Sequence, residues 1–235
     1  MISFKNFLNE SQWMYHGSTD KNIESLKPDR DHMVLDRAIG SHFAADPEIS
    51  KKFASGLYKD KTEGAVYKTK SLKRSELHVI HQKRYKHGAI ESDQNAIGSH
   101  VISTVLGHPD NKEMFKSWVK HARGVNDETA EAVHDHLTKG KAPADSKKFG
   151  LAATKRNNSF KSYISNFDSG LNMQPEPDFK KKVVSKYLDI MKAKGKKGLV
   201  YQNTSPMEKQ GARSTKNYIV FEPENLKLEK HEEAN

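Results

Sequence analysis

Cysteine is absent from this chain of 235 residues. Disulfide bonds, thiolate zinc sites and cysteine nucleophiles are therefore excluded, and nothing favours an oxidising compartment. Long apolar runs are also missing, because no stretch approaches the length of a membrane-spanning helix and no signal peptide is visible. Walker-type glycine-rich loops and the G-x-S-x-G nucleophile elbow do not occur either. We therefore expect a soluble protein that acts in a cytoplasm and has no membrane partner.

Hydrophobic residues are scarce, at 34%, whereas charged residues make up 30% and the formal net charge is +10. This composition is polar, but it is too rich in aromatic residues for a fully disordered chain. We expect a modest core with long solvated helices. The positive charge is compatible with a polyanionic partner such as nucleic acid, and equally with a lysine-rich surface that only serves solubility.

The histidines, 12 in all, show no metal-ligand spacing. His134 and His136 lie two residues apart in a predicted helix, so their side chains point to different sides and do not readily share a metal ion. We expect both on a solvated face, and we predict no metal site.

Hydrophobic periodicity divides the chain into strand-rich ends and a helical middle. Short β-branched and aromatic runs predict strands at residues 13–15, 65–72, 198–203 and 217–223. Asp46 and Pro47 are typical of a helix start. Apolar spacing predicts further helices within residues 90–108, 111–122, 126–137, 159–167 and 178–195. Because the strands at the two ends must pair to bury their faces, we predict an α+β fold with a β core split by a helical insertion.

The first ten residues, MISFKNFLNE, form a compact amphipathic segment. This segment resembles the capsid-targeting peptides of internal head proteins in large tailed phages, which carry an apolar-x-Glu cleavage site. Leu8-Asn9-Glu10 fits that site, with cleavage before Ser11. The resemblance implies a protein that is packaged in the capsid interior and then enters the host cytoplasm. The alternative is an ordinary N-terminal helix that docks on the core.

Four separated segments carry most of the chemistry: YHGS at residues 15–18, GSHFAADPEISKKFA at 40–54, GLVYQN at 198–203 and NYIVFEPENLKL at 217–228. In order and spacing they resemble the histidine-type branch of the ADP-ribosyltransferase superfamily, which contains the diphtheria-toxin-like and poly(ADP-ribose) polymerase-like domains. The small phage and polyvalent-protein members are the most similar. The resemblance covers both ends of the chain but not the helical block, and it implies NAD as co-substrate.

The reaction explains why such residues are needed. Cleavage of the nicotinamide–ribose bond develops an oxocarbenium-like ribose, so the site must hold nicotinamide, fix the ribose and stabilise positive charge. The resemblance implies that His16 hydrogen-bonds a ribose hydroxyl and that the Gly17 backbone holds the carboxamide. His42 stands where the family usually has a tyrosine that stacks on nicotinamide. The other cofactor contacts that the resemblance implies are Tyr15, Ser18, Gly40, Phe43 (packed beneath His42) and Tyr218.

Asn217 is the main departure from the family pattern. Polymerase-like members carry a glutamate at this position, which grips the ribose 2′-hydroxyl and orients the acceptor. An amide still donates and accepts hydrogen bonds, but it supplies no negative charge to the transition state. Glu208 or Gln210, on the preceding loop, are candidates to stand in for the carboxylate. By resemblance, the catalytic set is His16, His42 and Asn217.

The leading hypothesis is a phage mono-ADP-ribosyltransferase that modifies a host macromolecule, with a protein as the expected target. Two alternatives stay open: a basic internal head protein that binds DNA through a degenerate transferase fold, and a transferase that acts on nucleic acid. The expected organisation is a targeting peptide at residues 1–10, the first half of the transferase-like core at 11–80, the helical insertion at 81–196 and the second half of the core at 197–235.

Overall fold

The computed structural model describes residues 12–32, 34–55, 64–82, 92–139, 178–202 and 216–234. The chain divides into two compact units, one comprising Met1–Ala96 with Met191–Asn235 and the other Ile97–Ile190. The first unit thus joins the two ends of the sequence, and the second lies within the segment that was expected as an insertion. The expected short helix at 159–167, the loop residues Glu208 and Gln210, and the targeting peptide lie outside the described residues.

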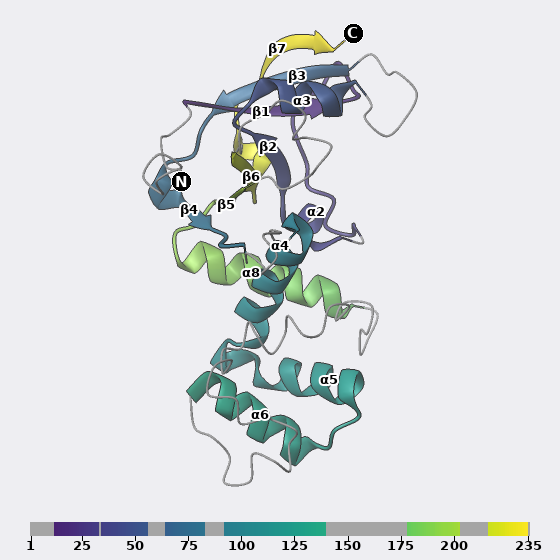
Figure 1. The fold of residues 1–235 in the computed structure, drawn as a ribbon, viewed down its shortest axis with the longest axis vertical. Helices are drawn as coiled ribbons and strands as arrows, with labels where there is room; N and C mark the ends of the chain where they lie inside the picture. Colours follow the sequence, from purple (N-terminus) through teal and green to yellow (C-terminus); the bar gives the residue numbers. More distant parts are fainter. Residues whose placement is uncertain are drawn as a thin grey trace, which may run out of the picture. The chain divides into compact units, whose positions relative to one another are not determined.

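The first unit is built on a seven-stranded sheet of order β4-β5-β6-β2-β1-β3-β7 (Figure 1). The strands are β1 Trp13–Ser18, β2 Ser41–Ala44, β3 Gly64–Lys70, β4 Leu77–Val79, β5 Gly198–Gln202, β6 Lys216–Val220 and β7 Glu229–Ala234. Only β4 and β5 run parallel among these strands; the other neighbours are antiparallel. Strands from the two ends of the chain alternate in the sheet, as the pairs β2–β6 and β3–β7 show. The predicted α+β class is confirmed.

The sheet narrows to a single residue pair between β1 and β2. Tyr15 pairs with Ala44 there, whereas β1 pairs with β3 along its whole length. In Figure 1, β1 and β3 run across the direction of β2 and β6. The sheet therefore has two halves, β4-β5-β6-β2 and β1-β3-β7, which meet at one joint.

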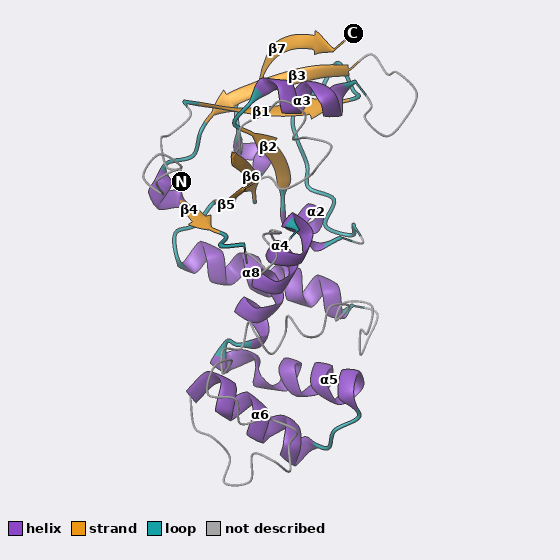
Figure 2. Ribbon diagram, in the orientation of Figure 1, coloured by secondary structure: helices purple, strands orange, loops and turns teal. Residues whose placement is uncertain are grey.

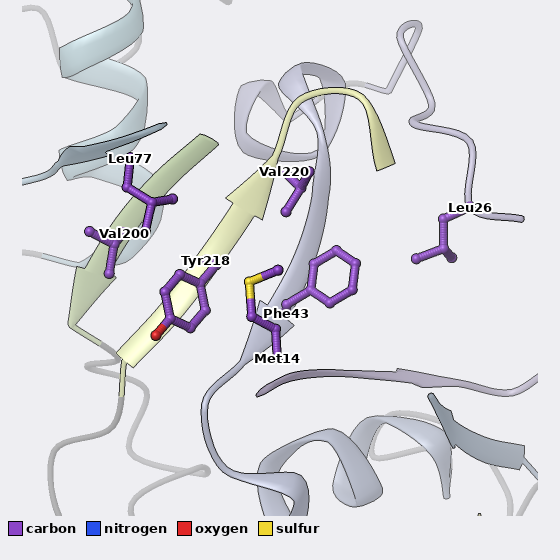
Figure 3. Close-up of a cluster of buried hydrophobic side chains, with 7 residues drawn as sticks. All are labelled: Met14, Leu26, Phe43, Leu77, Val200, Tyr218 and Val220. Atoms are coloured by element: carbon purple, nitrogen blue, oxygen red, sulfur yellow. The ribbon is translucent and has the colours of Figure 1, made fainter. Parts of the chain in front are cut away.

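One face of the sheet carries a hydrophobic cluster (Figure 3). Phe43, Tyr218 and Val200 are aligned on three neighbouring strands, so their side chains share this face. The full cluster consists of Met14, Leu26, Phe43, Leu77, Val200, Tyr218 and Val220. Because successive strand residues alternate between faces, His42, Asn217 and Tyr201 belong to the opposite face of the sheet.

The described part of the second unit is helical, and further helices belong to the first unit (Figure 2). Their bounds are α2 Leu35–Ile39, α3 Pro47–Ala54, α4 Asp93–Leu106, α5 Lys112–Arg123, α6 Asp127–Lys139 and α8 Phe179–Ala193. The Asp46 carboxylate accepts a hydrogen bond from the Glu48 amide at 3.0 Å, which confirms the predicted helix start. Among the described residues, no helix is long and apolar enough to cross a membrane.

Helix α3 packs directly on the backbone of β1. The Ser50 hydroxyl donates a hydrogen bond to the Tyr15 carbonyl at 2.9 Å. A Cβ atom on Gly17 would lie 1.8 Å from the Ser50 carbonyl oxygen, so only glycine permits this approach. The glycine that the sequence places after His16 is therefore required by helix packing, whatever else it does.

In the second unit, α5 packs against α6, and Phe115 and Trp118 of α5 and Val133 of α6 are buried. His134 is also buried, at 2% exposure, with its ring 5.2 Å from that of Phe115. The expectation that His134 lies on a solvated face was therefore wrong. Its helix turns this imidazole toward the partner helix, where it packs as an aromatic ring.

Candidate functional site

A cavity of about 670 Å³ lies in the first unit, next to the joint between the two halves of the sheet. This volume is within the range of small-molecule and cofactor sites. Seven of the site residues predicted from the sequence contribute to its wall: Tyr15, His16, Gly17, Gly40, His42, Phe43 and Asn217. Segments more than 150 residues apart in the sequence, such as β2 and β5, meet around it through the pairing of both with β6.

The imidazole of His16 is anchored to the backbone of β2. Its Nδ1 lies 2.8 Å from the His42 carbonyl oxygen. A carbonyl oxygen only accepts hydrogen bonds, so Nδ1 carries the proton and Nε2 of the neutral ring is an acceptor. Burial lowers the pKa of His16. The ring is therefore neutral at pH 7 and offers one lone pair for a ligand hydroxyl group.

His42 is held at both edges of its ring. Its Nδ1 lies 3.0 Å from the Tyr201 hydroxyl oxygen, and its Nε2 lies 3.7 Å from Oδ2 of Asp36. Burial is the main cause that lowers the pKa of His42; the Asp36 carboxylate opposes the shift and Arg37 adds to it. This ring is thus also neutral at pH 7, and its orientation is set by two polar neighbours.

Asn217 points a buried amide at the cavity. The residue is 8% exposed, and no described residue donates a hydrogen bond to its buried Oδ1. Asn217 is aligned with Ala44 on one side and Tyr201 on the other, so all three share the face that lines the cavity. A buried carbonyl oxygen without a donor costs about 1–3 kcal/mol. A ligand hydroxyl would satisfy this oxygen.

Three of the predicted cofactor contacts have positions that differ from the expectation. Phe43 lies on the opposite face of β2 from His42, with its ring 5.5 Å from that of His16, so it does not pack beneath His42. Tyr218 belongs to the hydrophobic cluster and Ser18 accepts a hydrogen bond from the Asp20 amide. Neither Tyr218 nor Ser18 is part of the cavity wall. The cause is strand alternation, which turns neighbours in a motif to opposite faces.

Gly40 lies where β2 approaches β6. A Cβ atom at this position would lie 2.2 Å from the Val220 carbonyl oxygen, so the two backbones come together only with glycine here. The close approach draws the end of α2 and the start of β2 against β6. It thereby brings His42 and Asn217 into the same wall.

Sequence reasoning missed two residues of the site. Asp36 belongs to the short helix α2, which no periodicity predicted, and its side chain reaches His42 only because α2 leads directly into β2. Tyr201 was inside a predicted strand and is 3% exposed, as a core residue would be. What distinguishes Tyr201 from an ordinary core residue is its contact with His42. This contact forms because β5 and β2 both pair with β6.

Charges of both signs line the cavity. Lys27 and Arg37 contribute positive charge, and Asp29, Asp36 and Asp93 contribute negative charge. Within the described part of the chain, no three histidine or acidic side chains gather in a way that could hold a metal ion. Comparison with known proteins adds no assignment, because no family model, curated protein or solved structure matches this chain.

Proposed function

We propose that this protein is a mono-ADP-ribosyltransferase that takes ADP-ribose from NAD and transfers it to a host macromolecule, most directly a protein. The observation that carries the proposal is the convergence of the four sequence segments on one cavity. Their strands β1, β2, β5 and β6 are neighbours in a single sheet, and each contributes a side chain to the cavity wall. The segments resemble the transferase motifs independently of this arrangement.

The chemistry of the wall suits NAD. The nicotinamide ring of NAD is cationic, and both histidines in the wall are kept neutral by burial, so neither repels it. His16 Nε2 and Asn217 Oδ1 are two acceptors without a donor assigned to them in the described structure, and they would accept from the two ribose hydroxyls. As the glycosidic bond breaks, its electron pair passes to nicotinamide and positive charge develops on the ribose. The Asp36 carboxylate lies in the same wall and favours that charge.

The test is incubation of the protein with NAD, with nicotinamide release followed by chromatography and transfer followed with NAD labelled in the adenylate. We expect saturable NAD binding, nicotinamide release, and label on a protein in a bacterial lysate. His16→Ala should lower nicotinamide release by at least tenfold, whereas the matched control His121→Ala, an exposed histidine on α5 of the second unit, should not. Absence of both NAD binding and nicotinamide release in the wild type would contradict the proposal.

The ion pairs formed by the lysines of α5 favour a protein acceptor over nucleic acid. Lys112, Lys116 and Lys120 all form ion pairs with carboxylates of α6, so their charge is largely neutralised locally. Among the side chains that the structure describes in these two helices, the three lysines therefore offer no row of free cations to a phosphate backbone. Treating the labelled lysate with protease or with nuclease distinguishes the two acceptors: protease should remove the high-molecular-weight label, and loss with nuclease would support the nucleic-acid alternative.

Packaging in a phage capsid remains a separate proposal that rests on the sequence MISFKNFLNE. It predicts that the protein recovered from particles begins at Ser11, which N-terminal mass spectrometry measures directly. Recovery of the chain with residues 1–10 still attached would contradict cleavage at Glu10.

A further inference from the structure

A basic patch lies on the first unit, where β4 and β5 begin. Two segments contribute to it, one immediately before β4 and the other at the end of α8, before β5. Its members are Lys73, Arg74, Lys192, Lys194, Lys196 and Lys197. Lys196 is partly buried and the others are exposed. None of these side chains contributes to the wall of the cavity, so the patch is separate from the candidate site.

The parallel pairing of β4 with β5 brings the two segments of the patch together. Leu77 is aligned with Gly198, so the two strands begin at the same edge of the sheet, and the segments that precede them are neighbours. The amide of Lys197 also donates a hydrogen bond to the carbonyl oxygen of Glu76 at 2.7 Å. The basic side chains are therefore gathered by the folded sheet and not by their order in the chain.

Little negative charge accompanies the patch. Glu76 is the one acidic residue within residues 64–76 and 190–202. Its Oε1 lies 2.6 Å from Lys197 Nζ, and its charge also interacts with that of Lys73. Lys196 Nζ donates to the carbonyl oxygen of Ser75 at 2.8 Å, a contact that holds the ammonium group without neutralising it. One carboxylate therefore neutralises at most one unit of the positive charge.

The other cations of the patch keep their charge. Arg74, Lys192 and Lys194 form no ion pair with any residue that the structure describes. The lysines of α5 differ in this respect, since each of them faces a carboxylate of α6. A concentration of positive charge that the chain does not neutralise attracts polyanions.

The uncharged residues of the patch indicate which polyanion fits it. Ser75, Ala193 and Gly195 are the exposed residues between the cations, and all of them are small. Protein–protein interfaces are enriched in aromatic side chains and depleted in lysine. Lysine and arginine on a polar surface are instead the usual partners of backbone phosphates. The patch therefore suits a nucleic-acid backbone better than an acidic protein surface.

We propose that the basic patch binds the phosphodiester backbone of nucleic acid, without reading its sequence, at a site separate from the cavity. This inference goes beyond the proposed function and does not depend on it, because no NAD chemistry is involved. Binding at the patch would bring the proposed transferase close to host proteins that occupy nucleic acid.

The experiment measures the binding of the full chain to short fluorescent duplexes of arbitrary sequence, one of DNA and one of RNA, by fluorescence anisotropy over a range of salt concentrations. Lys192→Gln/Lys194→Gln removes two charges of the patch. It should raise Kd at least tenfold at about 0.1 M salt. It should also flatten the slope of log affinity against log salt concentration by about 2, because each phosphate contact contributes about 0.9 to that slope.

The matched control is Lys52→Gln/Lys227→Gln, which removes the same net charge from the first unit but outside the patch and the cavity wall. Its Kd should stay within threefold of the wild type, and its slope should change by less than about 0.5. Nicotinamide release by Lys192→Gln/Lys194→Gln should match that of the wild type, because neither lysine lines the cavity.

A second variant, Arg74→Gln, tests whether the two segments form one site. Arg74 lies before β4, whereas Lys192 and Lys194 lie before β5. If the strands assemble one phosphate-binding surface, Arg74→Gln should flatten the salt slope by about 1 and weaken binding to both duplexes alike. An unchanged slope would overturn a site shared by the two segments.

Three further results would overturn the proposal. The first is wild-type protein that binds neither duplex at about 0.05 M salt, where phosphate contacts are strong. The second is an equal loss of affinity in Lys192→Gln/Lys194→Gln and in its control, which would mean that net charge acts without a localised site. The third is poly-glutamate that competes as well as the duplexes at equal charge concentration, which would indicate an acidic protein partner. None of these readouts involves NAD cleavage, so this proposal and the proposed function fail separately.

Discussion

Nδ1 of His16 lies 2.8 Å from the carbonyl oxygen of His42, and this bond bridges the joint between the two halves of the sheet. The β1–β2 ladder contains one residue pair, Tyr15 with Ala44. Beside that pair, the imidazole supplies the hydrogen bond that a longer ladder would have supplied through backbone amides. One side chain thus closes the sheet and lines the cavity, so the joint and the candidate site depend on each other.

Replacing His16 should therefore destabilise the fold. His16→Ala leaves the His42 carbonyl oxygen without its donor, and we expect the free energy of unfolding to fall by about 1–3 kcal/mol. Urea denaturation measures this loss. The exposed control His121→Ala, on α5, should stay within about 0.5 kcal/mol of the wild type. Equal stability of the two variants would show that the 2.8 Å contact contributes nothing to the joint.

Replacing Asn217 should affect the binding of NAD more than the stability of the fold. Its Oδ1 receives no hydrogen bond from the described residues, so Asn217→Ala breaks no bond to that oxygen and should change the free energy of unfolding by less than about 1 kcal/mol. The same variant should weaken NAD binding about tenfold, because the ligand loses an acceptor. Calorimetric titration with NAD and urea denaturation give the two numbers. A variant that binds NAD like the wild type would exclude Asn217 from the ligand contacts.

Two glycine substitutions separate close packing from helix propensity. Gly17→Ala places a Cβ atom 1.8 Å from the Ser50 carbonyl oxygen and should destabilise the protein by about 1–3 kcal/mol, since α3 must move. Gly98→Ala, inside α4, meets no atom within 4 Å and should stabilise by about 0.5–1 kcal/mol. Differential scanning calorimetry should show shifts of opposite sign. A destabilised Gly98→Ala would contradict the open space at that position.

Stability should decrease on acidification. Burial lowers the pKa values of His16 and His42, so below their ordinary pKa of about 6.5 the unfolded chain binds protons that the folded chain does not. The free energy of unfolding therefore falls as the pH falls from about 7 to 5. The double variant His16→Gln/His42→Gln should flatten this dependence, whereas the exposed His121→Gln should not. Thermal unfolding at a series of pH values measures this pH dependence. Identical slopes of stability against pH for the wild type and the double variant would show that these two imidazoles do not cause it.

Helices and strands with strong local sequence signals were predicted correctly. The Asp46 cap and Pro47 locate α3, and β-branched runs locate β5 and β6. Short elements were missed, because α2 spans five residues and has no periodicity to detect. Strand β7, Glu229–Ala234, was missed for another reason. Its sequence EKHEEA has no apolar alternation, since this edge strand is held by pairing with β3.

The candidate site, like the fold, was predicted from the sequence only in part. The motif around His16 and the strand containing Asn217 could be identified by their order in the chain, and both contribute to the cavity. The separation of Phe43 from His42, and of Tyr218 from Asn217, follows from strand alternation once the elements are known to be strands. Asp36 and Tyr201 could not be assigned, because their contacts with His42 join three elements whose pairing is not local.

The order of residues by itself determined the α+β class, the capped helix α3 and the strands at both ends, because these depend on interactions between near neighbours in the chain. Only the tertiary structure decided which side chains face the cavity. Strand register and the close backbone approaches at Gly17 and Gly40 bring His16, His42 and Asn217 to one wall, and these are contacts between segments that lie far apart in the sequence.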